Sequence, residues 1–157
     1  MLSQTSEYAL RAMVHLANNT GAPQTARQIA LGTFVPVPYL SKVLQSLNRA
    51  GLVKAQRGLH GGFVLRRSAD LLSMFDVVQA VDPIQRITEC PVGIESHGTT
   101  LCPLHRRIDD AINMVVTTFK ETRISDLLGD PSSHQPLCPF PLKAGEEDLV
   151  QVRSDRI

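Results

Sequence analysis

The fold of this chain is decided by residues 25–51, which read TARQIALGTFVPVPYLSKVLQSLNRAG. Thr25 and Gln28 have the spacing of a capping box, in which each side chain accepts the other residue's backbone N–H at the start of a helix. The pattern predicts a short helix that begins after Thr25 and ends near Gly32.

A second helix is predicted to follow a tight turn over residues 33–37. Pro38 suits the first helical position, and Gly51 suits the position just beyond the last one. Between them apolar residues recur at steps of three and four, namely Leu40, Val43, Leu44 and Leu47. A capped helix, a tight turn and a second amphipathic helix are the arrangement of a helix-turn-helix.

Directly after this second helix, residues 52–56 and 63–66 are two β-prone runs on either side of a glycine-rich tip, RGLHGG. Such a pattern predicts a β-hairpin. A hairpin in this place is a wing, so the expected fold class is mainly α with a small β-hairpin, a winged helix-turn-helix.

Further helices are expected on both sides of this unit. Residues 3–18 form one, which Ser3 or Thr5 can cap, and the pattern from Ser73 to Asp76 opens another that closes before Pro83. A long helix is predicted over 103–122 and a short one around 124–128. One face of the long helix is apolar, formed by Leu104, Ile108, Ala111, Ile112, Val115 and Phe119.

That long apolar face needs a partner. Packing onto the chain's own first helix is one solution, but a second copy of the chain is favoured, which predicts a homodimer. The expected organisation is a DNA-binding domain over 1–82, a metal- or cluster-binding loop over 83–103, dimerisation and short helices over 104–129, and a flexible tail over 130–157.

Composition points to a soluble, cytoplasmic protein. The chain has 157 residues, and no apolar run is long enough to cross a membrane, nor does a secretory leader open it. Residues 1–70 hold eight Lys and Arg against two acidic residues, whereas residues 71–157 hold eight against thirteen. A basic first half favours a nucleic acid partner, although a solvated basic face gives the same count.

If the partner is double-stranded DNA, the second helix of the helix-turn-helix enters the major groove. Lys42 can contact phosphate or guanine, and Gln45 can pair with adenine. Arg57 begins the wing, where an arginine can enter a narrow minor groove. The candidate DNA-binding residues are Ser3, Gln4, Pro38, Tyr39, Ser41, Lys42, Gln45, Arg49, Arg57, Gly58 and His60.

The three cysteines are Cys90, Cys102 and Cys138, an odd number that argues against a disulfide framework. Two of them lie in the stretch CPVGIESHGTTLCPLH, and the four candidate metal ligands there are Cys90, His97, Cys102 and His105. Two thiolates and two imidazoles suit a two-iron cluster or a zinc ion, and a set of ordinary thiols without metal is the third possibility. Cys138 lies in the tail and is interpreted as incidental.

Four segments together resemble the IscR/NsrR family of bacterial winged-helix regulators: LSQTSEYALRAM (2–13), PYLSKVL (38–44), LNRAGLV (47–53) and RGLHGGF (57–63). The resemblance covers about residues 1–129. It implies a homodimer with a long crossing helix that binds a two-fold operator. Many members carry an iron–sulfur cluster, and others carry none and respond through a partner protein or thiol chemistry.

The resemblance also bears on the ligands. Cluster-bearing members have three cysteines between the wing and the long helix, and Ser96 stands here at the middle position. His105 matches the histidine ligand of the IscR branch, and Glu7 matches a carboxylate that some members supply from the partner subunit. Ser41 replaces an acidic residue of that branch, so its base preference does not carry over.

The sequence therefore predicts a homodimeric transcriptional regulator, a repressor, whose operator affinity is modulated by an iron–sulfur cluster, a two-iron one, in the loop 90–105. A bound cluster would fix this loop and set the separation of the two recognition helices. The alternative is a cluster-free regulator that responds through zinc, thiol oxidation or a protein partner. An enzyme is not expected, because the loop has no Cys-x-x-Cys, no His-Glu-x-x-His and no evident general base. A winged-helix adaptor without DNA is disfavoured by the basic first half.

Overall fold

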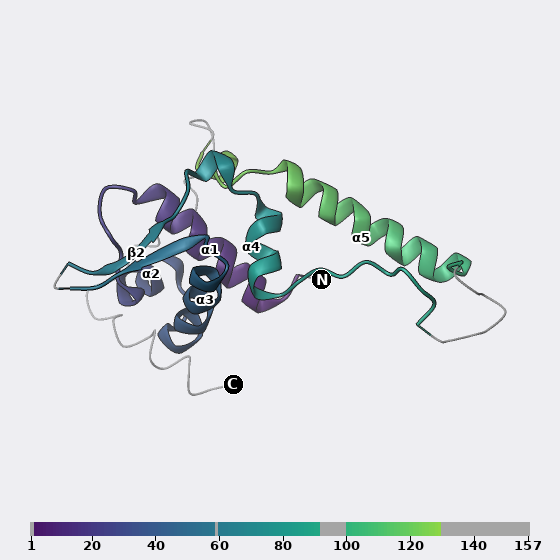
Figure 1. The fold of residues 1–157 in the computed structure, drawn as a ribbon, viewed down its shortest axis with the longest axis horizontal. Helices are drawn as coiled ribbons and strands as arrows, with labels where there is room; N and C mark the ends of the chain where they lie inside the picture. Colours follow the sequence, from purple (N-terminus) through teal and green to yellow (C-terminus); the bar gives the residue numbers. More distant parts are fainter. Residues whose placement is uncertain (1, 59, 92–99, 130–157) are drawn as a thin grey trace.

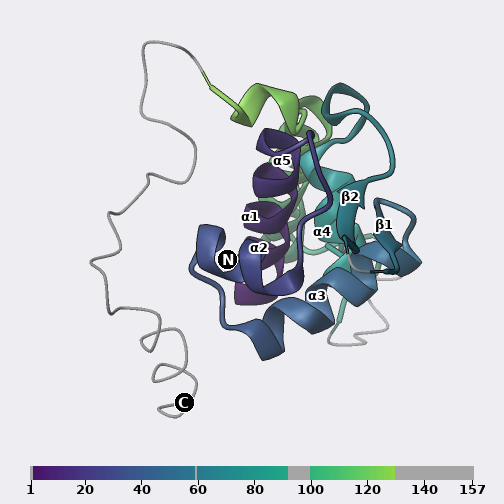
Figure 2. The same ribbon diagram turned by 90° about the vertical axis from the view of Figure 1, so that its left-hand side faces the viewer.

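The computed structural model describes residues 2–58, 60–91 and 100–129. Helices α1, α2, α3 and α4 and the hairpin gather into one body, from which the long helix α5 projects (Figure 1). A second view shows α1 standing between α2 and α4, with α3 across its end (Figure 2). The elements are α1 (Gln4–Asn18), α2 (Ala26–Thr33), α3 (Val37–Arg49), β1 (Val53–Gln56), β2 (Gly62–Leu65), η1 (Ala69–Leu71), α4 (Met74–Val81), α5 (Pro103–Glu121) and η3 (Ser125–Leu127).

The core forms around α1, which is capped at Ser3, whose hydroxyl accepts the N–H of Ser6. Met13 of this helix is completely buried, as are Leu40 and Leu44 of α3 and Val77 of α4. The core is aliphatic, in line with a composition that has no Trp. This packing fixes α3 to the body while one face of it stays in solvent.

Local signals set the helix-turn-helix as predicted. The capping box between Thr25 and Gln28 is present, and Phe34 ends α2 in the left-handed conformation. The second helix starts one residue earlier than predicted, at Val37, so Pro38 is its second residue. At its end Gly51 has φ 73°, its N–H bonds to Asn48, and the next N–H bonds back to the carbonyl of Leu47. These two bonds are a Schellman motif, which requires a left-handed residue at this position.

The wing is an antiparallel pair in which Val53 faces Leu65 and Gln56 faces Gly62. It is tied to the body by two backbone bonds between Gln24 and Phe63, of 2.8 and 3.0 Å. A Cβ on Gly62 would lie 2.6 Å from the carbonyl oxygen of Gln24. Glycine is therefore required where the two backbones pass this closely.

The far end of α5 is anchored to the start of α4. The N–H of Met74 donates to the carbonyl of Thr122 at 3.0 Å, and the N–H of Ile124 donates to the carbonyl of Leu72 at 2.8 Å. Beyond α5 the short helix predicted around 124–128 is a single 3-10 turn. Among the described helices, none is long and apolar enough to span a membrane.

Candidate nucleic-acid interface and metal centre

The outward face of α3 carries the residues that the sequence singled out. Tyr39 is 42% exposed, and the hydroxyl of Ser41 donates to the carbonyl of Val37 at 2.9 Å, which leaves its oxygen free to accept. The remaining candidates on this helix are exposed, namely Pro38, Lys42, Gln45 and Arg49. A helix whose buried side is apolar and whose solvent side is polar and cationic can lie against a duplex.

An aromatic side chain that the sequence reasoning missed connects α1 to this face. The rings of Tyr8 and Tyr39 meet edge to face, with centroids 6.5 Å apart. Gln4 donates from its amide to the hydroxyl of Tyr8 at 2.7 Å. The four-residue step from Gln4 to Tyr8 puts both on one side of α1, but only the fold brings Tyr39 to them.

The wing tip is exposed and cationic. Arg57, Gly58 and His60 are all exposed, and Gly58 has φ 114°. Lys54 and Arg66 extend the exposed positive charge along the hairpin. Ser3 lies elsewhere, at the start of α1, where its hydroxyl is engaged with Ser6.

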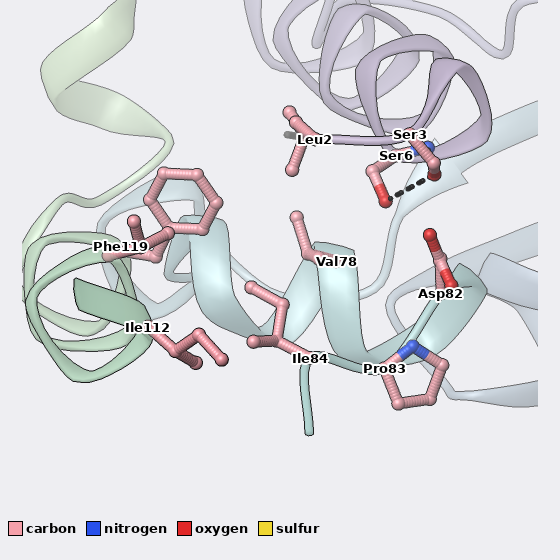
Figure 3. A pocket seen from close by; sticks show the side chains of 10 residues that line it. Leu2, Ser3, Ser6, Val78, Asp82, Pro83, Ile84, Ile112 and Phe119 are labelled. Atoms are coloured by element: carbon pink, nitrogen blue, oxygen red, sulfur yellow. Dashed lines mark hydrogen bonds between the residues drawn. The ribbon is translucent and has the colours of Figure 1, made fainter. Parts of the chain in front are cut away.

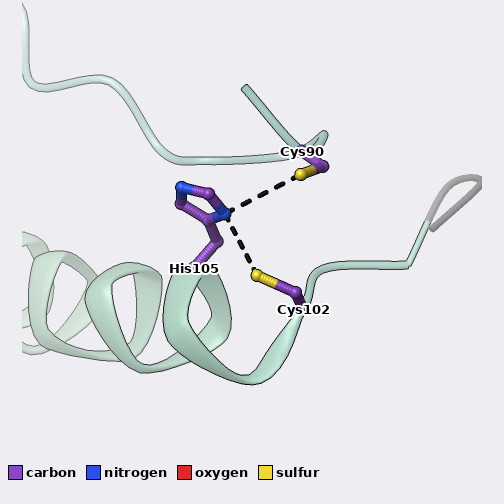
Figure 4. Close-up of side chains that lie close together, drawn as sticks. All are labelled: Cys90, Cys102 and His105. Carbon is purple, nitrogen blue, oxygen red and sulfur yellow. Dashed lines mark hydrogen bonds between the residues drawn. The ribbon is translucent and has the colours of Figure 1, made fainter. Parts of the chain in front are cut away.

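Three of the four predicted metal ligands come together at the start of α5. Cys102 is the residue before the helix, and His105 lies in its first turn. The Nδ1 atom of His105 is 3.2 Å from the Sγ of Cys102 and 3.8 Å from the Sγ of Cys90 (Figure 4). All three donor atoms lie within 4.8 Å of one another, and each residue is partly buried. Cys90 reaches this place from the linker that precedes α5.

The donor set fits a metal. Metal–sulfur bonds of about 2.3 Å and metal–nitrogen bonds of about 2.0 Å in a tetrahedral arrangement place donors roughly 3.5–3.8 Å apart. The observed separations of 3.2 and 3.8 Å lie close to that range. Two sulfurs and one imidazole nitrogen suit iron–sulfur clusters and zinc equally.

The fourth predicted ligand is His97, and the resemblance implies Glu7 as an extra one. His97 lies outside the described residues. Glu7 is on α1, where it is exposed and paired with Arg11, whose guanidinium also donates to the carbonyl of Thr33 at 3.3 Å. Glu7 therefore contacts no Cys or His ligand of the described part of its own chain.

An ion pair lies next to the three ligands, and the sequence reasoning did not find it. Its carboxylate, on Asp109, is buried, whereas its guanidinium, on Arg86, is exposed. Arg86, in the linker, donates to both carboxylate oxygens of Asp109 in α5, at 2.6 and 2.5 Å. The Arg86 guanidinium holds the pKa of Asp109 below its ordinary value. The sequence signal that could have pointed to this contact is the four-residue spacing of His105, Asp109 and Asn113, which places all three on one side of a helix.

A hollow of about 500 Å³ lies where α1, α4 and α5 meet. Its wall is mostly apolar, with Val78, Ile112 and Phe119 facing one another and Asp82 at the polar side (Figure 3). Val115 also lines it and is 44% exposed. The hollow thus continues onto the open apolar face of α5, on which Leu104 is 64% and Ile108 41% exposed.

The order of helix-turn-helix and wing, with an exposed cationic face, defines a DNA-binding protein. The family model described as Rrf2, iron-dependent transcriptional regulator, matches residues 2–130. The chain belongs to this family and is a transcriptional regulator rather than an enzyme. This confirms the resemblance and the fold class that the sequence predicted.

Individual relatives and solved structures are similar to the chain over most of its length. The chain is 32% identical over 129 residues to the protein aau3 of Rhizobium meliloti, covering 81% of this chain and 84% of the relative. The structure of CymR, the global cysteine regulator of B. subtilis, is 29% identical with a TM-score of 0.64, covering 81% of this chain and 95% of that one. IscR of T. potens is 22% identical with a TM-score of 0.69, covering 82% and 85%, and so supports the fold.

Proposed function

We propose that this chain is a cytoplasmic homodimeric repressor that binds a two-fold DNA operator with an affinity set by an iron–sulfur cluster. The observation that carries the proposal is the meeting of Cys90, Cys102 and His105 beside a helix-turn-helix of a family described as iron-dependent. These residues would hold the cluster, with His97 or the partner's Glu7 as the remaining ligand. When bound, the cluster would supply a redox-active group.

DNA is recognised by α3 and the wing. Lys42, Gln45 and Ser41 face the major groove, and Tyr39 contacts the backbone or a thymine methyl group. Arg57 and His60 contact the adjacent minor groove, while Arg49 and Gln4 contact phosphates. This assignment is supported by the exposure of these side chains, except the half-buried Ser41, on the cationic half of the chain.

The dimer forms through α5. Its open apolar face, with Leu104, Ile108 and Val115, is what a second copy of the helix would cover. The hollow beside Val115 gives the same partner a place to insert a side chain. Because the far end of α5 is bonded to α4, the position of the ligand loop is linked to the spacing of the two recognition helices.

A second candidate is a cluster-free regulator that holds one zinc ion. It is favoured by the donor separations of 3.2 and 3.8 Å, which suit a single tetrahedral ion. In that case DNA binding through α3 is unchanged, and the signal is a metal ion or thiol oxidation.

The test is to purify the full chain without oxygen and to measure its visible absorption with its iron, sulfide and zinc contents. A brown protein with about two irons and two sulfides per chain supports the cluster. That colour should be lost in Cys90→Ser, Cys102→Ser and His105→Ala and kept in Cys138→Ser, the matched control. A colourless wild-type protein containing zinc contradicts the cluster and supports the second candidate.

Coupling to DNA needs its own measurement. The operator affinity of the loaded protein is compared with that of the chelator-treated protein and of Cys90→Ala, at one fixed salt concentration. Equal affinities would show that the ligand loop does not control DNA binding.

A further inference from the structure

The segment that joins α4 to α5 runs back along α5 before it reaches the ligand loop (Figure 1). Arg86 lies in this linker, and Asp109 lies in the second turn of α5. The Nε atom of Arg86 donates to one carboxylate oxygen at 2.6 Å, and Nη2 donates to the other at 2.5 Å. Two parallel charged bonds of this kind fix orientation as well as distance.

Two further bonds hold the same place. The backbone N–H of Ile87 donates to Asp109 at 2.9 Å, and the remaining guanidinium nitrogen of Arg86 donates to the side chain of Asn113. Asp109 is only 9% exposed. The carboxylate therefore fastens the main chain of the linker, and not only one flexible side chain, to α5.

The register of this attachment determines where Cys90 lies. His105, Asp109 and Asn113 are spaced by four and share one side of α5, so His105 is one turn, about 6 Å, from Asp109. Cys90 is three residues beyond Ile87, which can span at most about 10 Å. A linker that runs opposite to the helix and is fixed at Asp109 thus brings Cys90 to His105.

We propose that the Arg86–Asp109 pair is a positioning clamp that holds Cys90 beside Cys102 and His105 before any metal or cluster binds. Without the clamp, the linker would lose the charged bonds that hold it to α5 in the described part of the chain. Bringing the ligands together would then cost loop entropy at each binding event. The consequence for metal affinity rests on the proposed function, whereas the closeness of the two thiols does not.

The first test measures that closeness in metal-free protein. The full chain carrying Cys138→Ser is treated with a chelator and then with diamide, which takes one hydrogen from each thiol and becomes the hydrazine as the disulfide forms. Asp109→Asn is expected to slow closure of the Cys90–Cys102 disulfide about ten-fold, and Asp110→Asn, the neighbouring exposed carboxylate, should leave the rate unchanged. Arg86→Leu should match Asp109→Asn, and Arg86→Lys, which keeps the charge, should restore part of the rate.

The second test measures ligand binding with Co²⁺, whose absorption bands report sulfur and nitrogen ligation. Loss of an outer residue that orients ligands commonly weakens metal binding about 10–100-fold. We expect a weakening of about ten-fold in Asp109→Asn, with unchanged far-UV circular dichroism and oligomeric state.

Three outcomes are separable. If Asp109→Asn and Arg86→Leu oxidise and bind Co²⁺ as the wild type does, the clamp is disproved and the metal site stands. In a second outcome, the Cys90–Cys102 disulfide forms quickly in the wild type and slowly in the variants, but neither the wild type nor any variant binds a cluster, zinc or Co²⁺. The clamp then stands and the proposed function fails. If Asp110→Asn is as impaired as Asp109→Asn, the effect is one of general charge and the clamp is disproved.

Discussion

The imidazole ring of His15 in α1 occupies the space beside Gly32 in α2, where a Cβ atom would overlap the ring. The Nε2 atom of His15 is buried and has no hydrogen-bond partner among the described residues. One turn earlier in α1, Arg11 donates to the carbonyl of Thr33, the last residue of α2. These contacts fix α1 against the helix-turn-helix.

Gly32→Ala should destabilise the DNA-binding domain. The added methyl group forces the His15 ring out of its place, and overpacking of this kind costs about 1–3 kcal/mol. The free energy of unfolding, measured by urea denaturation, checks this. Gly21→Ala is the matched control, because a Cβ there meets nothing within 4 Å. The double variant His15→Ala, Gly32→Ala should lose less stability than the two single changes together, and strict additivity would contradict the contact.

His15 should also make stability depend on pH. Burial lowers the pKa of its imidazole from the ordinary 6.5, and the nearby Gln24 side chain raises this pKa by a smaller amount. The unfolded chain then takes up the proton at a higher pH than the folded one does. The stabilisation is complete above pH 6.5, decreases as the pH falls through the interval between the two pKa values, and is lost below the folded value.

The measurement is urea unfolding across the pH range from 8 to 5, for the wild type and two variants. His15→Phe should flatten the profile near pH 6.5, because the titrating group is gone. His60→Gln, on the exposed wing, should retain the wild-type slope. A slope that persists in His15→Phe would assign the pH dependence to other groups.

Much of the fold was predictable because its signals are local. The capping boxes at Thr25 and Ser73 each lie within four residues, and both are formed. Gly51 reports the end of α3 because only a left-handed residue closes the Schellman motif there. The start of α3 was predicted one residue too late. Pro36 is the residue before the helix and Val37 is its first residue, so Pro38 is its second.

The candidate site was predictable only in part. Cys102 and His105 share one helical turn, so their spacing alone brought them together. The approach of Cys90 depends on a linker that reverses along α5 and on an ion pair between residues far apart in the chain. The Tyr8–Tyr39 contact likewise arises from packing between α1 and α3, which no local pattern encodes.

Lys42→Ala should weaken DNA binding and change its response to salt. Each phosphate contact releases counterions, so losing one should reduce the slope of log affinity against log salt by about 1. The duplex is one selected from random sequence by the wild-type protein, and affinity is measured by fluorescence anisotropy at several salt concentrations. Arg106→Ala, an exposed cation on α5 with no predicted DNA contact, is the control. An unchanged slope in Lys42→Ala would remove this residue from the phosphate-binding set.

Ile108→Glu should convert the proposed dimer to monomers. Ile108 is 41% exposed on the open apolar face of α5, and a carboxylate there is left without water or a partner once a second copy covers it. Thr117→Glu is the matched control, because it lies nine residues further along the same helix, which places it on the opposite side. Sedimentation velocity should show a dimer for the wild type and Thr117→Glu and a monomer for Ile108→Glu.

Since the two half-sites of an operator are read together only by a dimer, Ile108→Glu should also lose operator affinity while it keeps the fold of its DNA-binding domain. A monomeric wild type would assign the apolar face to a different partner, and a dimeric Ile108→Glu would place the interface elsewhere on the chain.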